Sequence, residues 1–367
     1  MIHQCIYDTQ HTMDDGFGTD LKNKKILIIF AEMDDWSEED KRQSVLSVEE
    51  LVKELKDTGL TNIFVKKIVE PIDECFVGFD PRETVVFNWT ESWGNDGTDY
   101  WTIPDHLEKL GYVFTGSSAA CLRETIDKVA VKKKMLELGL PTPVTKIYDS
   151  VDSNGWQTFP ALVKPAREHC STGITRDAVV DNASQLHRRV EYILNMYGPH
   201  GVIVEDFIEG NEYNVAVWGN EVPEALPIGM IDYATFDDYH DRICGFDAKW
   251  VEGSKEWVGT EVICPAPLSP DMKKKLEDVA ILAYKTFGLR DYARIDIRVR
   301  DEIPYILDVN SNPDITTSGG LVRSIRKAGY TYGSGVAKIL EMALARMSSP
   351  PVLKYPSSRS SGPSPLI

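Results

Sequence analysis

The sequence of 367 residues lacks any apolar run near the roughly 20 residues that a membrane span requires. Its longest apolar run, Ile26–Phe30, has the length of a buried strand. Residues 1–23 lack the apolar core of a signal peptide. The six cysteines form no Cys-x-x-Cys pair, and the seven histidines have no metal-ligand spacing. These absences predict a cytoplasmic protein with free thiols and without structural zinc.

Basic residues are also few: 40 Lys and Arg face 57 Asp and Glu, which gives a net charge of −17. Such a field repels phosphate backbones, so we expect no nucleic-acid partner and no membrane partner. A small anionic substrate would need a local basic pocket. The sequence leaves a homodimer open.

Strand and helix patterns alternate between two loose tails, residues 1–23 and 348–367. Residues 24–116 read as an α/β domain with a doubly wound parallel sheet. Its predicted strands are Lys25–Phe30, Ile63–Ile68 and Thr84–Asn88. A helix over Glu38–Leu55 is expected to bury an apolar face made of Val45, Val48, Leu51, Val52 and Leu55. A second unit is predicted over residues 117–206 and a third over residues 207–347.

Near the end of the third unit, polar residues alternate with apolar ones in two segments joined by the polar residues 300–302. Folded as a hairpin, the segments place Asp296 opposite Asp308, with Arg294 and Asn310 beside them. Two carboxylates and a carboxamide suit a hard divalent cation that shares its ligands with phosphates. The alternative is a solvated amphipathic hairpin.

Two lysines stand where an anion could bind. Lys164 ends a short apolar strand, and a small-residue loop follows that contains Cys170 and Ser171. Lys128 begins a helix, where a cation opposes the helix dipole unless an anion is present. Surface lysines beside an ordinary loop are the alternative.

Two carboxylates, Glu205 and Glu212, flank a turn between predicted strands and could accept hydrogen bonds from an amino group or a ribose. A long polar segment follows, with Lys249 and Trp250 near its middle. Because it has neither a helical nor a strand period, the sequence predicts a lid or binding loop there.

These segments occur in the order found in the ATP-grasp superfamily, and the chain resembles its D-alanine–D-alanine ligase family over roughly residues 24–345. The resemblance implies an α/β N-terminal domain followed by two α+β subdomains that clasp ATP. It also implies an ATP-dependent ligase that joins a carboxylate to an amine through an acyl phosphate. The products would be an amide, ADP and phosphate.

The resemblance further implies a role for each matching position. Phosphate, adenine and ribose contacts would come from Lys128, Lys164, Glu205 and Glu212. The loop over the phosphates would contain Cys170 and Ser171, and a movable loop would contain Lys249 and Trp250. Two Mg²⁺ ions, with Mn²⁺ as an alternative, would bind Asp296, Asp308 and Asn310. The catalytic residues would be Arg294, Lys249 and Ser171, and Arg294 would steady the acyl phosphate and the tetrahedral intermediate.

The departures from the family concern the substrates. Asp314 replaces a family glycine, close to the expected amine-substrate residues Ser318 and Gly319. The acidic residue that holds the first amino acid has four candidates: Glu32, Asp34, Asp35 and Asp40. Another family loop reads Asn95-Asp96-Gly97, and Asp308 stands where the family commonly has Glu.

Because a third carboxylate would repel a free α-carboxylate, Asp314 favours a ligase for another carboxylate–amine pair. It could instead turn outward and cap the helix near Gly320. A true D-alanine–D-alanine ligase and a non-catalytic nucleotide-binding regulator remain alternatives.

Overall fold

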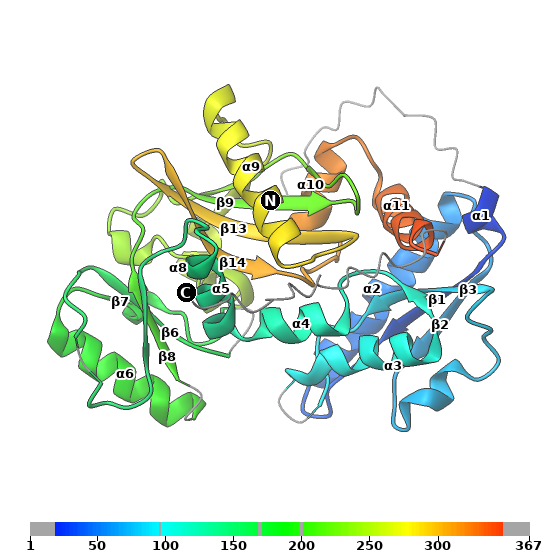
Figure 1. The fold of residues 1–367 in the computed structure, drawn as a ribbon, viewed down its shortest axis with the longest axis horizontal. Coiled ribbons are helices and arrows are strands. Elements are labelled where there is room, and N and C mark those ends of the chain that lie inside the picture. Colours follow the sequence, from blue (N-terminus) through cyan, green and yellow to red (C-terminus); the bar gives the residue numbers. More distant parts are fainter. Residues whose placement is uncertain (1–18, 95–96, 154, 168–170, 199–200, 348–367) are drawn as a thin grey trace, which may run out of the picture.

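The structure is a computed structural model that describes residues 19–94, 97–153, 155–167, 171–198 and 201–347. Within these ranges the chain forms three sheets that follow one another along the sequence (Figure 1). A search of the described helices found none that is long and apolar enough to cross a membrane.

The first sheet is parallel and has the strand order β2-β1-β3-β4. Its strands are β1 (Lys25–Phe30), β2 (Ile63–Lys67), β3 (Thr84–Trp89) and β4 (Val113–Phe114). The helices α2 (Glu38–Asp57) and α11 (Tyr332–Ala345) cover one face, and η1 (Ile72–Phe76) and α3 (Thr102–Leu110) cover the other. Two short elements complete the unit: α1 (Thr19–Lys22) and η2 (Asp99–Trp101). The predicted parallel α/β architecture is confirmed.

The helix α2 begins after Ser37, whose hydroxyl accepts a hydrogen bond from the backbone N–H of Asp40 at 3.1 Å. Its buried residues are Val48, Leu51 and Leu55. The expectation that Val45 also belongs to the buried face is wrong, because its side chain is 39% exposed. Residues 38–47 contain no buried position, so only the second half of α2 packs against the sheet.

The second sheet is antiparallel and has the strand order β5-β8-β6-β7. Its strands are β5 (Thr145–Tyr148), β6 (Ala161–Pro165), β7 (Val179–Val180) and β8 (Val202–Asp206). The amphipathic helix α6 (Ala183–Tyr197) packs on it, and η3 (Arg176–Ala178) precedes β7. Two helices lead into this unit from the first sheet: α4 (Ala119–Ile126) and α5 (Lys128–Glu137).

The third sheet is also antiparallel, in the order β12-β11-β9-β13-β14, with β10 paired to β9. Its strands are β9 (Glu212–Trp218), β10 (Glu224–Ala225), β11 (Gly229–Asp232), β12 (Glu261–Ile263), β13 (Tyr292–Arg300) and β14 (Ile303–Asn310). The helix α9 (Pro270–Thr286) packs against β9, β13 and β14 after an N-cap at Ser269. The short helix α10 (Gly320–Lys327) follows β14.

The long polar segment contains more regular structure than its sequence predicts: η4 (Tyr239–Asp241), α7 (Phe246–Trp250) and α8 (Lys255–Gly259). Each is too short for a hydrophobic period to be visible. Local capping defines α8 instead, because the hydroxyl of Ser254 accepts a hydrogen bond from the backbone N–H of Trp257 at 3.0 Å.

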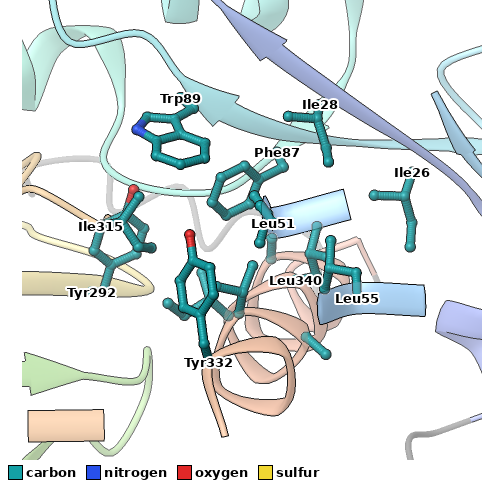
Figure 2. Close-up of a cluster of buried hydrophobic side chains, with 14 of the residues drawn as sticks. Ile26, Ile28, Leu51, Leu55, Phe87, Trp89, Tyr292, Ile315, Tyr332 and Leu340 are labelled. Atoms are coloured by element: carbon teal, nitrogen blue, oxygen red, sulfur yellow. The ribbon is translucent and has the colours of Figure 1, made fainter. Parts of the chain in front are cut away.

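The closing helix α11 contacts its sequence neighbour α10 and lies beside α2, which is distant from it in the sequence (Figure 1). Figure 2 shows the apolar cluster that results, with side chains from the first sheet, α2 and α11 meeting Tyr292 and Ile315. The last segment of the chain therefore joins the first sheet to the third. This contact also places the loop after β14 beside the carboxyl end of β3.

Candidate active site

The hairpin β13–β14 has the register that the sequence predicts. Asp296 pairs with Asp308, and Arg294 pairs with Asn310. The connecting residues Asp301 and Glu302 have φ values of 52° and 61°. Positive φ at both positions is the geometry of a tight two-residue hairpin turn, which pairs Arg300 with Ile303. An irregularity between Asp296 and Ile297 then shifts the pairing by one residue and brings Asp308 opposite Asp296. The four polar residues therefore lie on neighbouring positions of the two strands.

Asp296 is held by three neighbouring side chains. Arg294 donates to it through Nε at 2.8 Å and through Nη2 at 3.0 Å. The amides of Asn310 and Asn214 donate at 2.9 and 2.8 Å. Burial disfavours the charged form of Arg294, but the Asp296 carboxylate outweighs it and raises the pKa of Arg294. Sequence reasoning missed Asn214, which lies on β9 directly across from Asp296.

Asp308 is more open than Asp296. Its Oδ1 accepts the backbone N–H of Val309 at 3.0 Å, and its Oδ2 lies 3.6 Å from Nζ of Lys128. Lys128 stands at the start of α5, where Asp127 caps the helix by accepting from Val129 and Ala130. The predicted phosphate lysine and the predicted metal ligand are thus neighbours.

A buried cluster connects the second sheet to α5. Lys164 on β6 and Glu205 on β8 form an ion pair of 2.6 Å. The other oxygen of Glu205 lies 3.1 Å from Nζ of Lys132, a residue that sequence reasoning missed. Lys132, Lys164 and Glu205 are 3%, 5% and 1% exposed. The sequence could have indicated Lys132, because this residue follows Lys128 by four positions and therefore lies on the same face of α5.

Burial lowers the pKa of Lys132 to about 8, although Glu205 opposes the shift. Burial raises the pKa of Glu205. The ammonium groups of Lys132 and Lys164 outweigh burial and lower this pKa below its usual value. The carboxylate is therefore ionised at neutral pH. Both of its oxygens face lysine ammonium groups.

Glu212 is held on the third sheet by two residues that the sequence did not indicate. Arg298 donates to its carboxylate through Nε at 2.9 Å, and the hydroxyl of Tyr233 donates at 3.0 Å. The guanidinium of Arg298 lies 5.1 Å from the ring centre of Phe207 and 5.5 Å from that of Tyr233. Glu212 is thus anchored beside an aromatic surface.

Ser171 adopts a φ of 64° and donates its hydroxyl to the carbonyl of Cys244 at 2.9 Å. Burial raises the pKa of the Cys244 thiol, and Lys249 acts against that shift. The charges of Glu212, Asp296 and Arg294 also act on this thiol. Cys244 therefore lies in the same charged site as the predicted residues, and it was not anticipated. Trp250 is 57% exposed on α7, and the predicted Cys170 lies outside the described residues.

A charged network ties the polar segment to the second sheet. His240 contacts Asp238 at 2.6 Å and Asp181 at 3.0 Å. Burial opposes protonation of His240, but its bonds to the two carboxylates outweigh that effect and raise its pKa. Lys255 at the start of α8 pairs with Asp241 at 2.7 Å. The network thereby holds the residues that precede and follow α7.

The loop after β14 contains the expected amine-substrate residues. Asp314 is exposed and accepts the backbone N–H of Thr316 at 2.8 Å. A Cβ on Gly319 would lie 2.7 Å from the carbonyl oxygen of Asp314, so this position requires glycine. A Cβ on Gly320 would lie 3.9 Å from Cδ of Arg294. The start of α10 therefore faces the catalytic arginine candidate, with exposed Ser318 just before it.

A second carboxylate, Glu91, lies near this loop. Asn312 donates to the carbonyl of Thr90 at 3.0 Å, which joins the loop to the segment after β3. Glu91 accepts the indole N–H of Trp89 at 3.1 Å. Its side chain keeps solvent contact, yet desolvation by nearby atoms and then the charge of Asp314 raise its pKa. Glu91 was not identified from the sequence.

The four candidates for holding the first substrate differ in structure. Glu32 lies two residues after the end of β1, has a side chain only 9% exposed, and pairs with Lys67 at 2.7 Å. Asp40 accepts the hydroxyl of Ser37 at 2.6 Å and belongs to the cap of α2. Asp34 and Asp35 are exposed. Glu32 is thus the candidate that the fold places at the carboxyl end of a central strand.

A parallel sheet followed by two antiparallel sheets, with buried lysines facing an acidic hairpin, defines an ATP-grasp enzyme. Residues 144–341 match the profile of the D-ala D-ala ligase C-terminus. A D-alanine–D-alanine ligase of Ralstonia pickettii is 30% identical over 277 residues, 72% of this chain and 76% of that protein. An uncharacterized Sinorhizobium fredii protein, y4sG, is 32% identical over 279 residues, 74% of this chain and 79% of its own length.

A crystal structure of the Bacillus anthracis D-alanine–D-alanine ligase complexed with ATP has a similar fold. It superposes with a TM-score of 0.66 at 21% identity and covers 88% of this chain and 98% of its own. The chain belongs to the D-alanine–D-alanine ligase family. It is an ATP-dependent carboxylate–amine ligase, as the sequence predicts.

Proposed function

We propose that this ligase joins a small carboxylate to an amine that lacks a free α-carboxylate. The observation that carries this proposal is the exposed carboxylate of Asp314 in the turn before α10, with the segment that contains Glu91 joined to this loop through Asn312 and Thr90. Gly320 leaves the space between this loop and Arg294 free of a side chain. An ammonium or amine group would be attracted to such a site, and a second carboxylate would be repelled.

In the proposed reaction the first substrate's carboxylate attacks the γ-phosphorus of ATP, and ADP leaves. The amine then attacks the carbonyl carbon of the acyl phosphate. Inorganic phosphate leaves with the bonding electrons, and the nitrogen loses a proton. Arg294, fixed by Asp296, would steady the acyl phosphate and the negative charge on the tetrahedral oxygen. Lys249 and Ser171 would act from the segments that meet at Cys244.

Nucleotide contacts are proposed for the buried and half-buried groups on the second sheet and on α5. Lys164 and Lys128 would bind the phosphates, and Lys249 would reach the γ-phosphate. Glu205 would accept a hydrogen bond from the adenine amino group through an oxygen lone pair that the two lysines leave free. Glu212, anchored by Arg298, would accept from the ribose hydroxyls. Cys170 and Trp250 would flank the phosphates.

Asp296, Asp308 and Asn310 fit divalent cations, because two carboxylates and a carboxamide lie together on adjacent strands. Asp308, whose side chain is 30% exposed, is the more accessible of the two carboxylates. We propose two Mg²⁺ ions here, with Mn²⁺ as a substitute; when bound, they would neutralise phosphate charge. The amide of Asn310 would turn its oxygen toward the metal.

The test is phosphate release with ATP and Mg²⁺, using amino acids and simple amines singly and in pairs. We expect phosphate release only when a carboxylate and an amine are both present. A des-carboxy amine should be preferred to D-alanine as the amine. Efficient D-alanyl-D-alanine formation would favour the alternative of a true D-alanine–D-alanine ligase, which the names of the relatives support. Loss of phosphate release in Arg294→Met would separate ligase turnover from contaminating ATPase.

We also propose that the enzyme is cytoplasmic, since Cys75, Cys121, Cys244 and Cys264 are free thiols. A homodimer is the oligomeric state to test by sedimentation equilibrium. A concentration-independent monomer mass would exclude it.

A further inference from the structure

The buried cluster around Glu205 has more positive than negative charge. Lys132 and Lys164 share this one carboxylate, and the nearby pair of Lys128 and Asp308 adds one charge of each sign. Three ammonium groups therefore face two carboxylates. A buried excess of positive charge is unfavourable in a low dielectric unless an anion compensates it.

Lys132 itself is directed into the protein rather than toward a ligand. Its ammonium donates to the hydroxyl of Thr142 at 2.7 Å and to the carbonyl of Ile306 at 3.3 Å, and Glu205 lies 3.1 Å away. An ammonium has three N–H groups. Three acceptors within the fold therefore surround Lys132. The residue lies one helical turn after Lys128 on the same face of α5.

Lys164 differs, because its only partner within the described part of the chain is Glu205, at 2.6 Å. Two of its N–H groups are thus available, although the residue is only 5% exposed. If Glu205 had no second cation, this carboxylate would cancel the charge of Lys164. The presence of Lys132 leaves that charge uncancelled.

We propose that Lys132 is a positioning residue for ATP: it serves as the second counter-ion of Glu205 and so leaves the Lys164 ammonium available to the phosphates. This inference rests on the proposed role of Lys164 in phosphate binding. Lys132 acts through Glu205 and does not touch the nucleotide. The role explains why a lysine with a lowered pKa is buried in the interior, where an apolar residue would pack at less cost.

The charge balance predicts the behaviour of variants. Lys132→Met leaves two ammonium groups and two carboxylates, so the cluster becomes neutral. Lys132→Met combined with Glu205→Gln leaves two ammonium groups and one carboxylate, which restores the original excess. The glutamine side chain would also keep an acceptor oxygen. Glu205→Gln should therefore restore ATP affinity that Lys132→Met loses. If Lys132→Met acted only by removing a structural contact, Glu205→Gln would not restore it.

The experiment is titration calorimetry of ATP with Mg²⁺ into the full chain, with thermal unfolding measured on each variant. We expect Lys132→Met to raise the Kd for ATP about tenfold or more, because one buried charge near the phosphates is lost. The double variant should bind ATP at least threefold more tightly than Lys132→Met, while Glu205→Gln alone reports the loss of the proposed adenine contact. Lys134→Met is the matched control, since Lys134 lies on the same helix but pairs with Glu124 at 2.8 Å.

An unchanged Kd in folded Lys132→Met, or a double variant that binds as weakly as the single one, would overturn the proposal. If Lys132→Met does not fold, the double variant is compared with Glu205→Gln. A Kd ten times weaker in the double variant would overturn the proposal, because Lys132 would then act without Glu205. A wild type that does not bind ATP would instead refute the proposed nucleotide site. Unchanged affinity in Lys164→Met would refute the phosphate contact of Lys164 and, with it, the positioning role of Lys132.

Discussion

Asp314 offers a direct test of substrate choice, because its charge can be removed without changing its shape. In Asp314→Asn the side-chain oxygen can still accept the N–H of Thr316, which is bonded at 2.8 Å in the wild type. The turn that leads into α10 should therefore persist. Asp314→Gly would remove the turn contact as well, so the comparison of the two variants separates charge from loop conformation.

The magnitude follows from the exposure of Asp314. Two carboxylates about 4 Å apart repel each other by about 4 kcal/mol at an effective dielectric near 20, and by about 1 kcal/mol in water. Because Asp314 is exposed, the lower end of this range applies. A difference of about 1.4 kcal/mol is a tenfold change. We therefore expect Asp314→Asn to raise kcat/KM for D-alanine as the amine donor about fivefold, mainly through KM.

The assay is steady-state phosphate release with saturating ATP and Mg²⁺, with D-alanine and a des-carboxy amine as competing donors. Asp271→Asn is a matched control, since Asp271 is an exposed aspartate near Glu302, at the turn end of the hairpin. The des-carboxy amine should lose rate in Asp314→Asn but keep it in the control. If kcat/KM for D-alanine changes by less than twofold, Asp314 does not select against carboxylates and acts only in the turn.

Three other perturbations test the metal site, the nucleotide site and the charged network. Asp308→Ala should reduce turnover at least a hundredfold with an unchanged Tm. Asp296→Ala should also destabilise the fold by about 3 kcal/mol, because it leaves the half-buried Arg294 without its carboxylate. Equal stability of the two variants in denaturant unfolding would contradict this. Lys164→Ala should raise the Kd for ATP by tenfold or more in calorimetry, and unchanged affinity would count against the nucleotide site. His240 has a raised pKa, so its contribution to stability is complete below its unfolded pKa of about 6.5 and is lost as pH rises through the folded pKa. The Tm of the wild type should therefore fall over that pH range more than the Tm of His240→Gln. Parallel pH profiles of the two Tm values would exclude the effect.

Much of the metal-site candidate could be predicted from the sequence because its parts are close together in the chain. Strict alternation assigned one face of the hairpin. The turn at Asp301 and Glu302 does not by itself set which residues oppose each other, because a register shift between Asp296 and Ile297 brings Asp308 opposite Asp296. The strands β1 and β3 of the first sheet were equally predictable, since buried parallel strands are continuous apolar runs. The short strand β4 was not predicted. The start of the capped helix α9 was indicated by Ser269 and Pro270.

What the sequence did not show depends on contacts between distant segments. Lys132 and Glu205 lie 3.1 Å apart only because α5, whose buried residues pack in the core of the third sheet, also meets β8. Asn214 reaches Asp296 because β9 pairs with β13, a register that no local pattern specifies. Val45 follows the helical period of α2 but extends beyond the surface that the sheet and α11 cover.

The sequence by itself determined the order of the elements, the polar face of the hairpin and the resemblance to carboxylate–amine ligases, because these depend on neighbouring residues. The tertiary structure decided which charges share a buried environment and where α11 closes against the first sheet (Figure 2). The physical reason is that periodicity records only which face of an element is apolar. The partner of a buried charge is set by long-range packing, since an ammonium group or carboxylate can be buried only where the fold brings its counter-ion.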